Sequence, residues 1–172
     1  MANVVPTAGN KLPMNKRTLF KAILVTLREE LGTFTRAANA ARAEATDPQS
    51  RAENKYDTRG LEASYLAAGQ ARQAADLETA ISAFEMLPAR QFAADEPITL
   101  GALVELEQNG ERMFYFIGPC AGGTEAKCGN HEVLVITPQS PLGGQLQGRK
   151  QGDRLELTLG GKQRKVCVVS VE

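Results

Sequence analysis

Small and apolar side chains recur at alternating intervals of four and three residues in the first half of the chain, beginning at Phe20. This spacing keeps the side chains on one face of a helix and is typical of a coiled-coil seam. The seam comprises Phe20, Leu24, Leu27, Leu31, Phe34, Ala38, Ala41 and Ala45. The pattern predicts a long helix that packs against a partner helix.

The pattern stops at Thr46-Asp47-Pro48, because proline disfavours helix in the residue before it. Ser50 is a suitable N-cap for a second helix, and Glu53 would complete a capping box. The second seam comprises Tyr56, Gly60, Ala63, Ala67, Gln70, Ala74, Leu77, Ile81 and Phe84. Two seams joined by a short turn predict an antiparallel coiled-coil hairpin over residues 14–88, with its tip near residues 46–57.

The size of the seam residues changes along this hairpin. Leucine and phenylalanine lie at its base, whereas alanine and glycine lie toward the turn. Each arm of a little over thirty residues would extend roughly 50 Å at the helical rise per residue. A hairpin this long either packs into a helical bundle or projects as a free-standing rod. Because no further long helix is predicted in the sequence, we expect a free-standing rod.

From Pro97 onward, glycine and β-branched residues replace alanine, which predicts a small β-sheet domain over residues 97–172. Asn109-Gly110 is a strong hairpin signal between two alternating segments, and Gly160-Gly161 marks a second hairpin. Residues 131–137 read as a buried strand, and residues 140–148 read as a short helix with Ser140 as N-cap and Pro141 at its first position. The predicted fold class is therefore α+β.

Composition narrows the class of protein further. The chain has 172 residues, with 20 basic and 20 acidic side chains and a formal net charge of zero, which does not support a general polyanion-coating role. No apolar run reaches the roughly 18 residues that a membrane span needs. Residues 1–13 lack an apolar signal core and read as a disordered leader. Three cysteines without CxxC spacing suit a reducing cytoplasm.

Candidate metal and charge features in the second half are weak. The spacing of Cys120, Cys128 and His131 does not match common zinc sites, so residues 118–130 are expected to form a loop with incidental thiols. Cys167 alternates with valines and is expected in the core. Six basic residues cluster near the C-terminus, and they either solubilise a sheet edge or face an acidic protein rim. They are Arg149, Lys150, Arg154, Lys162, Arg164 and Lys165.

The segment from Ile136 to Leu157, ITPQSPLGGQLQGRKQGDRLEL, resembles the C-terminal domain of the bacterial transcript-cleavage factors GreA and GreB. That family pattern is a strand, Ser-Pro, a short helix with two leucines, Gly-Lys or Gly-Arg, Gly-Asp and a second strand. The matching residues are Ser140, Pro141, Leu142, Leu146, Gly148, Arg149, Lys150, Gly152 and Asp153. The predicted helical hairpin is similar to the N-terminal coiled coil of the same family.

The resemblance implies an FKBP-like C-terminal domain that docks on RNA polymerase through these motif residues, and a coiled coil that enters the secondary channel. Carboxylates at the coiled-coil tip would help to hold a Mg²⁺ ion shared with the polymerase, close to the RNA 3′ end. The protein would then be a monomer that supplies metal ligands to the polymerase and is not an independent enzyme.

The tip itself lies in the charged stretch AENKYDTRGLE, residues 52–62. Family tips resemble Gly-Asp-Leu-x-Glu-Asn-x-Glu-Tyr, so Glu53 and Asn54 match the Glu-Asn pair, and Ser50 stands where the family has Asp. Asp57, four residues after Glu53 on the same helix face, or Asp47, the nearest upstream acid, is the candidate second carboxylate. The alternative interpretation is a solvated, charged helix face.

Three functions follow from these observations. The first is stimulation of RNA cleavage by RNA polymerase. The second is regulation from the secondary channel without cleavage, because the acidic pair is incomplete at Ser50. The third is an FKBP-like prolyl isomerase or chaperone, which the small number of aromatic residues disfavours.

Overall fold

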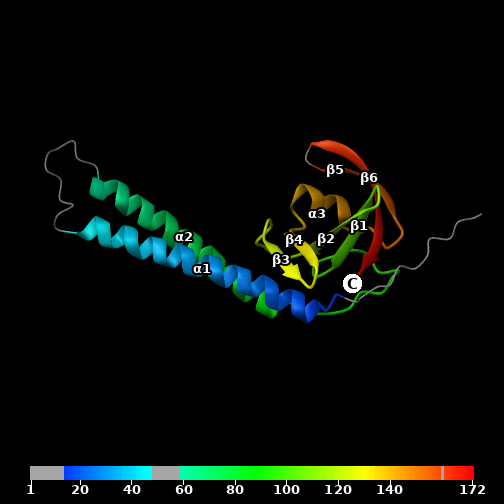
Figure 1. Cartoon of the computed structure of the whole chain (residues 1–172), viewed down its shortest axis with the longest axis horizontal. Coiled ribbons are helices and arrows are strands. Elements are labelled where there is room, and N and C mark those ends of the chain that lie inside the picture. The colour runs from blue at the N-terminus through cyan, green and yellow to red at the C-terminus, as the bar shows by residue number, and fades with distance from the viewer. Residues whose placement is uncertain (1–13, 48–58, 160) are drawn as a thin grey trace, which may run out of the picture.

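The computed structural model describes residues 14–47, 59–159 and 161–172. Helix α1 (Lys16–Thr46) begins after Asn15, whose side chain accepts a hydrogen bond from the Arg17 backbone N–H. It ends at Asp47, as the sequence predicts. Helix α2 (Arg59–Met86) returns antiparallel beside α1, and the two form an arm that extends away from the sheet domain (Figure 1). The leader predicted at residues 1–13 and the cap predicted at Ser50 lie outside the described residues.

The predicted seams are confirmed. Every described seam residue on both helices is buried or half-buried, whereas most residues between them are exposed. Ala38, Ala41 and Ala63 are the buried residues of the far half, and Phe20, Leu27 and Phe84 are buried at the base. Small side chains let the helix backbones approach closely, and the 31 residues of α1 span about 46 Å.

Within the described residues, six strands form one mixed sheet in the order β3-β4-β2-β1-β6-β5. The strands are β1 (Leu103–Gln108), β2 (Glu111–Ile117), β3 (Glu125–Cys128), β4 (His131–Ile136), β5 (Arg154–Leu159) and β6 (Lys162–Val171). Only the pairing of β2 with β4 is parallel among these strands. The β1–β2 hairpin turns at Asn109-Gly110, where both residues have positive φ, as this turn type requires.

The two faces of the sheet are covered by different helices. Helix α3 (Pro141–Leu146) lies over one face, where Leu146 packs with Val104, Leu106 and Val168. The base of the hairpin covers the other face. Phe116 of β2 lies between the two long helices, with its ring centroid 5.3 Å from that of Phe20 and 6.1 Å from that of Phe84.

This second core corrects the expectation of a free-standing rod. Leu19 and Ile23 lie off the coiled-coil seam, yet each is 0 % exposed, because they join the cluster that contains Val133 and Val135 of the sheet. Only the part of the hairpin beyond the sheet projects. Its base and the sheet share one core, so the two predicted modules are not independent packing units.

Two smaller expectations were wrong. The predicted loop at residues 118–130 contains β3, which pairs with β4 along one edge and contacts α1 along the other. Cys167 is half-buried and belongs to neither core cluster, because it lies on the opposite face of β6 from the buried Val166 and Val168. A valine-cysteine alternation cannot reveal which face of a strand is covered.

Candidate functional site

Of the three acidic residues predicted to bind Mg²⁺ at the tip of the hairpin, Asp47 lies within the described residues. Asp47 is exposed and forms the C-cap of α1, where its backbone N–H donates a hydrogen bond to the carbonyl of Glu44. The other tip candidates, Glu53 and Asp57, lie outside the described residues, as does Ser50. Across the part of the chain that the structure describes, no three histidine, cysteine or acidic side chains group as a metal site. Carboxylate oxygens are nevertheless the ligands that Mg²⁺ prefers, so the donor type fits this ion.

The Ser140–Asp153 motif occupies α3 and the loop that leads into β5. The Ser140 hydroxyl accepts a 3.1 Å hydrogen bond from the Gly143 N–H and donates a 2.7 Å bond to the Thr137 carbonyl. Pro141 holds the first helical position, as predicted. A Cβ at Gly143 would collide with the Thr137 carbonyl, so only glycine fits there. These contacts fix the start of α3 against the end of β4.

The rest of the motif closes the loop around the domain core. Leu146 is 0 % exposed and Leu142 is half-buried beside it. Gly148 and Gly152 have φ of 80° and 89°, where glycine is favoured. The Asp153 carboxylate accepts a 2.9 Å hydrogen bond from the Lys150 N–H. Several residues predicted to bind a partner therefore stabilise the fold of the domain, through burial, turn conformation or internal hydrogen bonds.

The exposed part of the motif is small and basic. Pro141, Arg149 and Lys150 are exposed, together with Gly148 and Gly152. Two backbone hydrogen bonds to Ile98 hold the chain beneath the two cations. The Ile98 N–H donates a 2.7 Å bond to the Arg149 carbonyl, and the Gly148 N–H donates a 2.9 Å bond to the Ile98 carbonyl. Of the predicted docking residues, Pro141, Arg149 and Lys150 are thus the side chains that can meet a partner directly.

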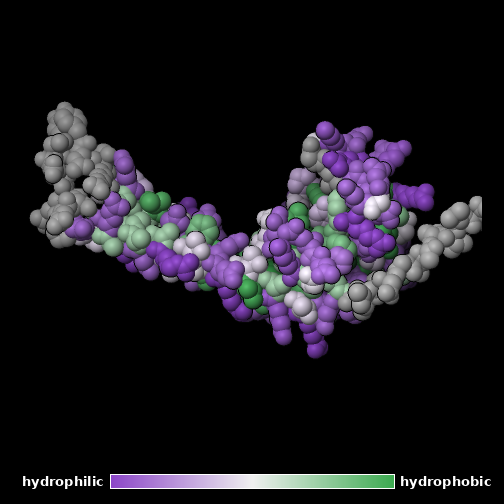
Figure 2. All heavy atoms as spheres, in the orientation of Figure 1, coloured by the Kyte–Doolittle hydropathy of each residue, from purple (hydrophilic) through white to green (hydrophobic). Residues whose placement is uncertain are grey.

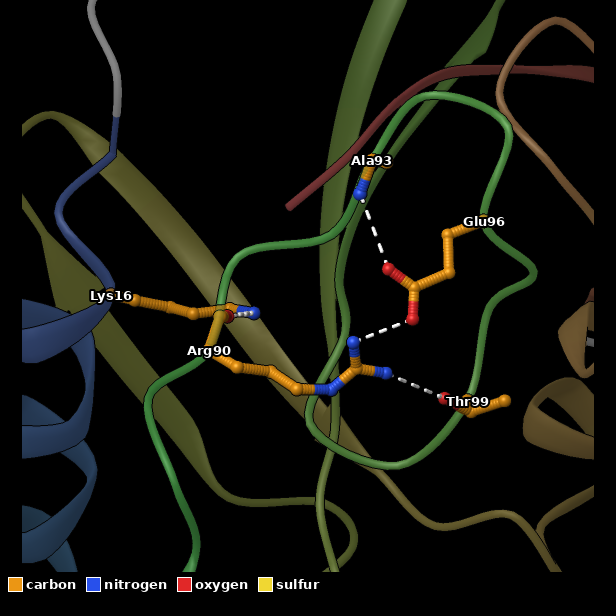
Figure 3. Close-up of polar contacts among 5 residues, drawn as sticks. All are labelled: Lys16, Arg90, Ala93, Glu96 and Thr99. Atoms are coloured by element: carbon orange, nitrogen blue, oxygen red, sulfur yellow. Dashed lines mark hydrogen bonds and ion pairs between the residues drawn. The ribbon is translucent and has the colours of Figure 1, made fainter.

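A polar junction that sequence patterns did not indicate joins the hairpin to the sheet domain (Figure 3). Lys16, only 3 % exposed, donates a 2.6 Å hydrogen bond from Nζ to the carbonyl oxygen of Arg90. Its ammonium lies 4.5 Å from the ring centroid of Phe92, and the Arg90 guanidinium lies 3.7 Å from the same ring. Arg90 also bonds to Glu96 at 2.5 Å. Two cations and one aromatic ring therefore hold the linker against the start of α1.

Burial and neighbouring charges both shift the pKa values of side chains at this junction. The pKa of Lys16 is lowered to about 8, by burial above all and then by the nearby Arg90, while the charges of Glu172 and Glu96 act in the opposite direction. The hydrogen bond from Arg90 lowers the pKa of the Glu96 carboxyl. A single lysine at the start of a helix has no periodic signal, and Phe92 lies in a linker without one, so only their packing identifies the junction.

The remaining candidate chemistry is not supported by the geometry. The rings of His131 and Phe114 are tilted by 46° with centroids 4.5 Å apart, and both side chains line a shallow hollow beside β2 and β4. Cys120 and Cys128 pack against the core, and burial raises the pKa of both thiols. A thiol held neutral is a poor nucleophile and a poor metal ligand.

Among the described residues, no helix has the length and apolar content to cross a membrane.

Comparison with models of known protein families gives one match, to the second half of the chain. Residues 93–172, which include the whole sheet and α3, match the family described as "Transcription elongation factor, GreA/GreB, C-term". A search of curated proteins finds no match.

Three solved structures are similar to this chain over most of its length. The GreA factor homolog 1 (Gfh1) protein of Thermus thermophilus is 25 % identical over 92 % of this chain and 95 % of its own, with a TM-score of 0.39. Gfh1 of Thermus aquaticus is 23 % identical over 90 % and 94 %, with a TM-score of 0.36. A GreA/GreB factor from Nitrosomonas europaea is 17 % identical over 78 % and 91 %, with a TM-score of 0.35.

The family match coincides with the domain that contains the Ser140–Asp153 motif, whose serine, glycines and leucines shape the start and end of α3. Residues 93–172 of this chain therefore match the C-terminal domain of the GreA/GreB transcription elongation factors.

Proposed function

We propose that this protein is a transcription elongation factor that docks its sheet domain at the rim of the RNA polymerase secondary channel, inserts its helical hairpin, and stimulates cleavage of backtracked RNA. The observation that carries the proposal is the hairpin itself. It projects from a GreA/GreB-family domain and has the exposed carboxylate of Asp47 at its far end. A narrow arm of about 46 Å can bring acidic side chains to a site that a compact domain cannot enter.

The surface of the arm supports insertion between protein walls. Leu61, Tyr65 and Leu66 lie in the half of α2 nearer the tip and are 56 %, 71 % and 55 % exposed. Large apolar side chains gathered on an exposed surface are typical of interaction sites. In free solution these side chains stabilise neither the seam nor the core, so a bound partner gives them a role.

At the tip, Glu53 is the proposed principal ligand for Mg²⁺, with Asp57 or Asp47 as the second carboxylate. Bound there, the ion would stabilise the attacking and leaving oxygens of phosphodiester hydrolysis. The carboxylates of this chain would orient the ion and its water beside the RNA 3′ end. The polymerase would provide the rest of the active site.

Docking is proposed to use the exposed cations of the motif, Arg149 and Lys150, beside Pro141. The double variant Arg149→Glu/Lys150→Glu is expected to weaken binding to RNA polymerase at least tenfold, because charge reversal replaces attraction by repulsion. Lys21→Glu/Lys127→Glu is the matched control, since it changes the net charge equally at two exposed positions away from the motif. Equal loss in the two variants would contradict the docking assignment.

The decisive experiment is incubation of a stalled, backtracked elongation complex with the full chain and Mg²⁺, with the length of the RNA 3′ end as the readout. Wild type is expected to shorten the RNA. Glu53→Gln should abolish shortening but retain polymerase binding, because the glutamine keeps the shape and removes the charge. Asp57→Asn and Asp47→Asn should be compared, and the true second ligand should give the larger loss.

Ser50 favours one alternative function, a channel-bound regulator that does not promote cleavage. If wild type never shortens RNA at any Mg²⁺ concentration but slows nucleotide addition, this alternative replaces cleavage. Ser50→Asp restores the acid at the position where the family has one. An increase in cleavage by this variant would support the proposed tip chemistry.

A further inference from the structure

The zero net charge of the chain conceals a basic end on the sheet domain. Arg154 at the start of β5 and Lys162, Arg164 and Lys165 on β6 are all exposed. Glu156 is the only acidic residue between Arg154 and Lys165 in the sequence. This segment, which we term the basic ribbon, therefore carries a net charge of +3, and the rest of the chain carries −3. Hydrophilic side chains cover this end of the domain in Figure 2.

The basic ribbon extends beyond the body of the sheet. β6 pairs with β1 only from Cys167 to Val171, whereas residues 162–166 of β6 pair with β5 alone. β5 forms the edge of the sheet opposite β3, the strand that contacts the hairpin. The two-stranded ribbon lies at the sheet edge opposite the arm and arches over α3 (Figure 1), where the Thr158 N–H donates a 2.9 Å hydrogen bond to the Gln145 side chain.

Contacts within the protein neutralise little of this charge. Lys165 lies 3.5 Å from Glu156, with side chains 87 % and 60 % exposed, and such a surface pair contributes little. Arg164 donates a 3.2 Å hydrogen bond to the uncharged Gln108. In the described part of the chain, neither Arg154 nor Lys162 has an ion pair. The cations therefore remain available to an anionic partner.

The composition of the ribbon surface favours nucleic acid over protein. Its exposed described side chains are all polar or charged, because Leu157 and Val166 are buried and Leu155 is half-buried. Protein interfaces need an apolar centre, whereas binding to nucleic acid is dominated by phosphate neutralisation. The segment contains no aromatic residue, so it cannot stack on unpaired bases.

We propose that the basic ribbon binds the sugar–phosphate backbone of double-stranded nucleic acid without reading its sequence. The register places Arg154 and Lys165 on one face of the ribbon and Lys162 and Arg164 on the other, so the cations flank the ribbon on both sides. Because β5 packs against α3, these exposed cations would contact backbone phosphates from outside the grooves. This surface is separate from the tip of the hairpin, and the proposal does not depend on RNA cleavage.

Fluorescence anisotropy of a labelled duplex DNA of about 20 base pairs, titrated with the full chain in 50 mM salt, tests this proposal. Four phosphate contacts predict a slope of about −3.6 in the logarithm of affinity against the logarithm of salt concentration. Lys162→Gln/Arg164→Gln/Lys165→Gln should bind at least tenfold more weakly, with a slope near about −0.9. Duplexes of different sequence should bind equally well.

The matched control is Arg36→Gln/Arg42→Gln/Arg72→Gln, which removes three exposed cations from the hairpin and should weaken DNA binding less than twofold. Circular dichroism melting checks that both variants fold. Equal losses in the two variants, or no binding by wild type, would overturn the proposal. It also fails if the ribbon variant keeps its DNA affinity but loses affinity for polymerase free of nucleic acid, because the ribbon would then contact an acidic protein surface.

Discussion

The Lys16 ammonium donates a 2.6 Å hydrogen bond to the backbone carbonyl of Arg90, 74 residues later in the chain. The bond joins the start of α1 to the linker between the hairpin and the sheet domain. Phe92, which Lys16 and Arg90 both contact, belongs to the core beneath α3. The junction therefore connects the arm to the core of the sheet domain that α3 covers, in addition to the core that the arm shares with the other face.

The first prediction is a pH dependence of stability that comes from Lys16. Its pKa is about 8 in the folded protein, because of burial above all, and 10.5 is the ordinary value. Below pH 8 the lysine is charged in both states, and its burial costs free energy. Between pH 8 and 10.5 only the unfolded state keeps the proton, so the free energy of unfolding rises with pH, by at most about 3 kcal/mol.

Lys16→Met should lose this increase, because methionine fills the same space without a proton to release. The measurement is chemical denaturation of wild type and variant at pH 7 and pH 10. The difference in the free energy of unfolding between the two proteins at each pH cancels the titration of the groups that they share. A stability difference between the two proteins that is equal at both pH values would show that Lys16 is not desolvated.

The second prediction concerns the core shared by the hairpin base and the sheet. Leu27 is 0 % exposed in this core, so Leu27→Asp places an unpartnered carboxylate there and should cost several kcal/mol. Val25→Asp is the control on the same helix, because Val25 is 53 % exposed and should shift stability by less than about 0.5 kcal/mol. Thermal melting followed by circular dichroism measures both. Similar melting temperatures for the two variants would refute the shared core.

The third prediction concerns the narrow half of the hairpin. Ala41 is 5 % exposed between the helices, so Ala41→Leu forces them apart and should cost about 1–3 kcal/mol. Ala40→Leu adds the same atoms at an exposed position one residue earlier and should be nearly neutral. Urea denaturation distinguishes them. A stable Ala41→Leu variant would mean that the small seam residues do not set the helix separation.

The fourth prediction concerns α3, which carries the docking motif. Gly143→Ala should destabilise the domain, because its Cβ would collide with the Thr137 carbonyl beneath the helix. Gly144→Ala meets only an ordinary contact, 3.7 Å from the Pro138 carbonyl, and should stabilise the helix by up to about 1 kcal/mol. Melting temperatures that move in opposite directions are expected. Destabilisation by both substitutions to the same extent would contradict the tight packing at Gly143.

Several features of this protein follow from the sequence alone, because short-range rules govern them. The alternating spacing of Phe20, Leu24 and Leu27 determines which helix face is buried, whatever lies beyond it. Asn109-Gly110 adopts the positive φ angles that a tight hairpin needs, and Ser140 caps α3 through its own side chain. The GreA/GreB motif was recognisable because its turn and cap residues have fixed positions in the chain.

Other features were decided only by tertiary packing. Leu19 and Ile23 lie beside the seam, and only the sheet that covers them accounts for their burial. The four-residue β3 carries Glu125 and Lys127 among its residues and forms because β4 and α1 lie on either side of it. Lys16 is buried because a linker more than seventy residues away supplies its carbonyl partner. Such contacts depend on where distant segments meet, which local periodicity does not encode.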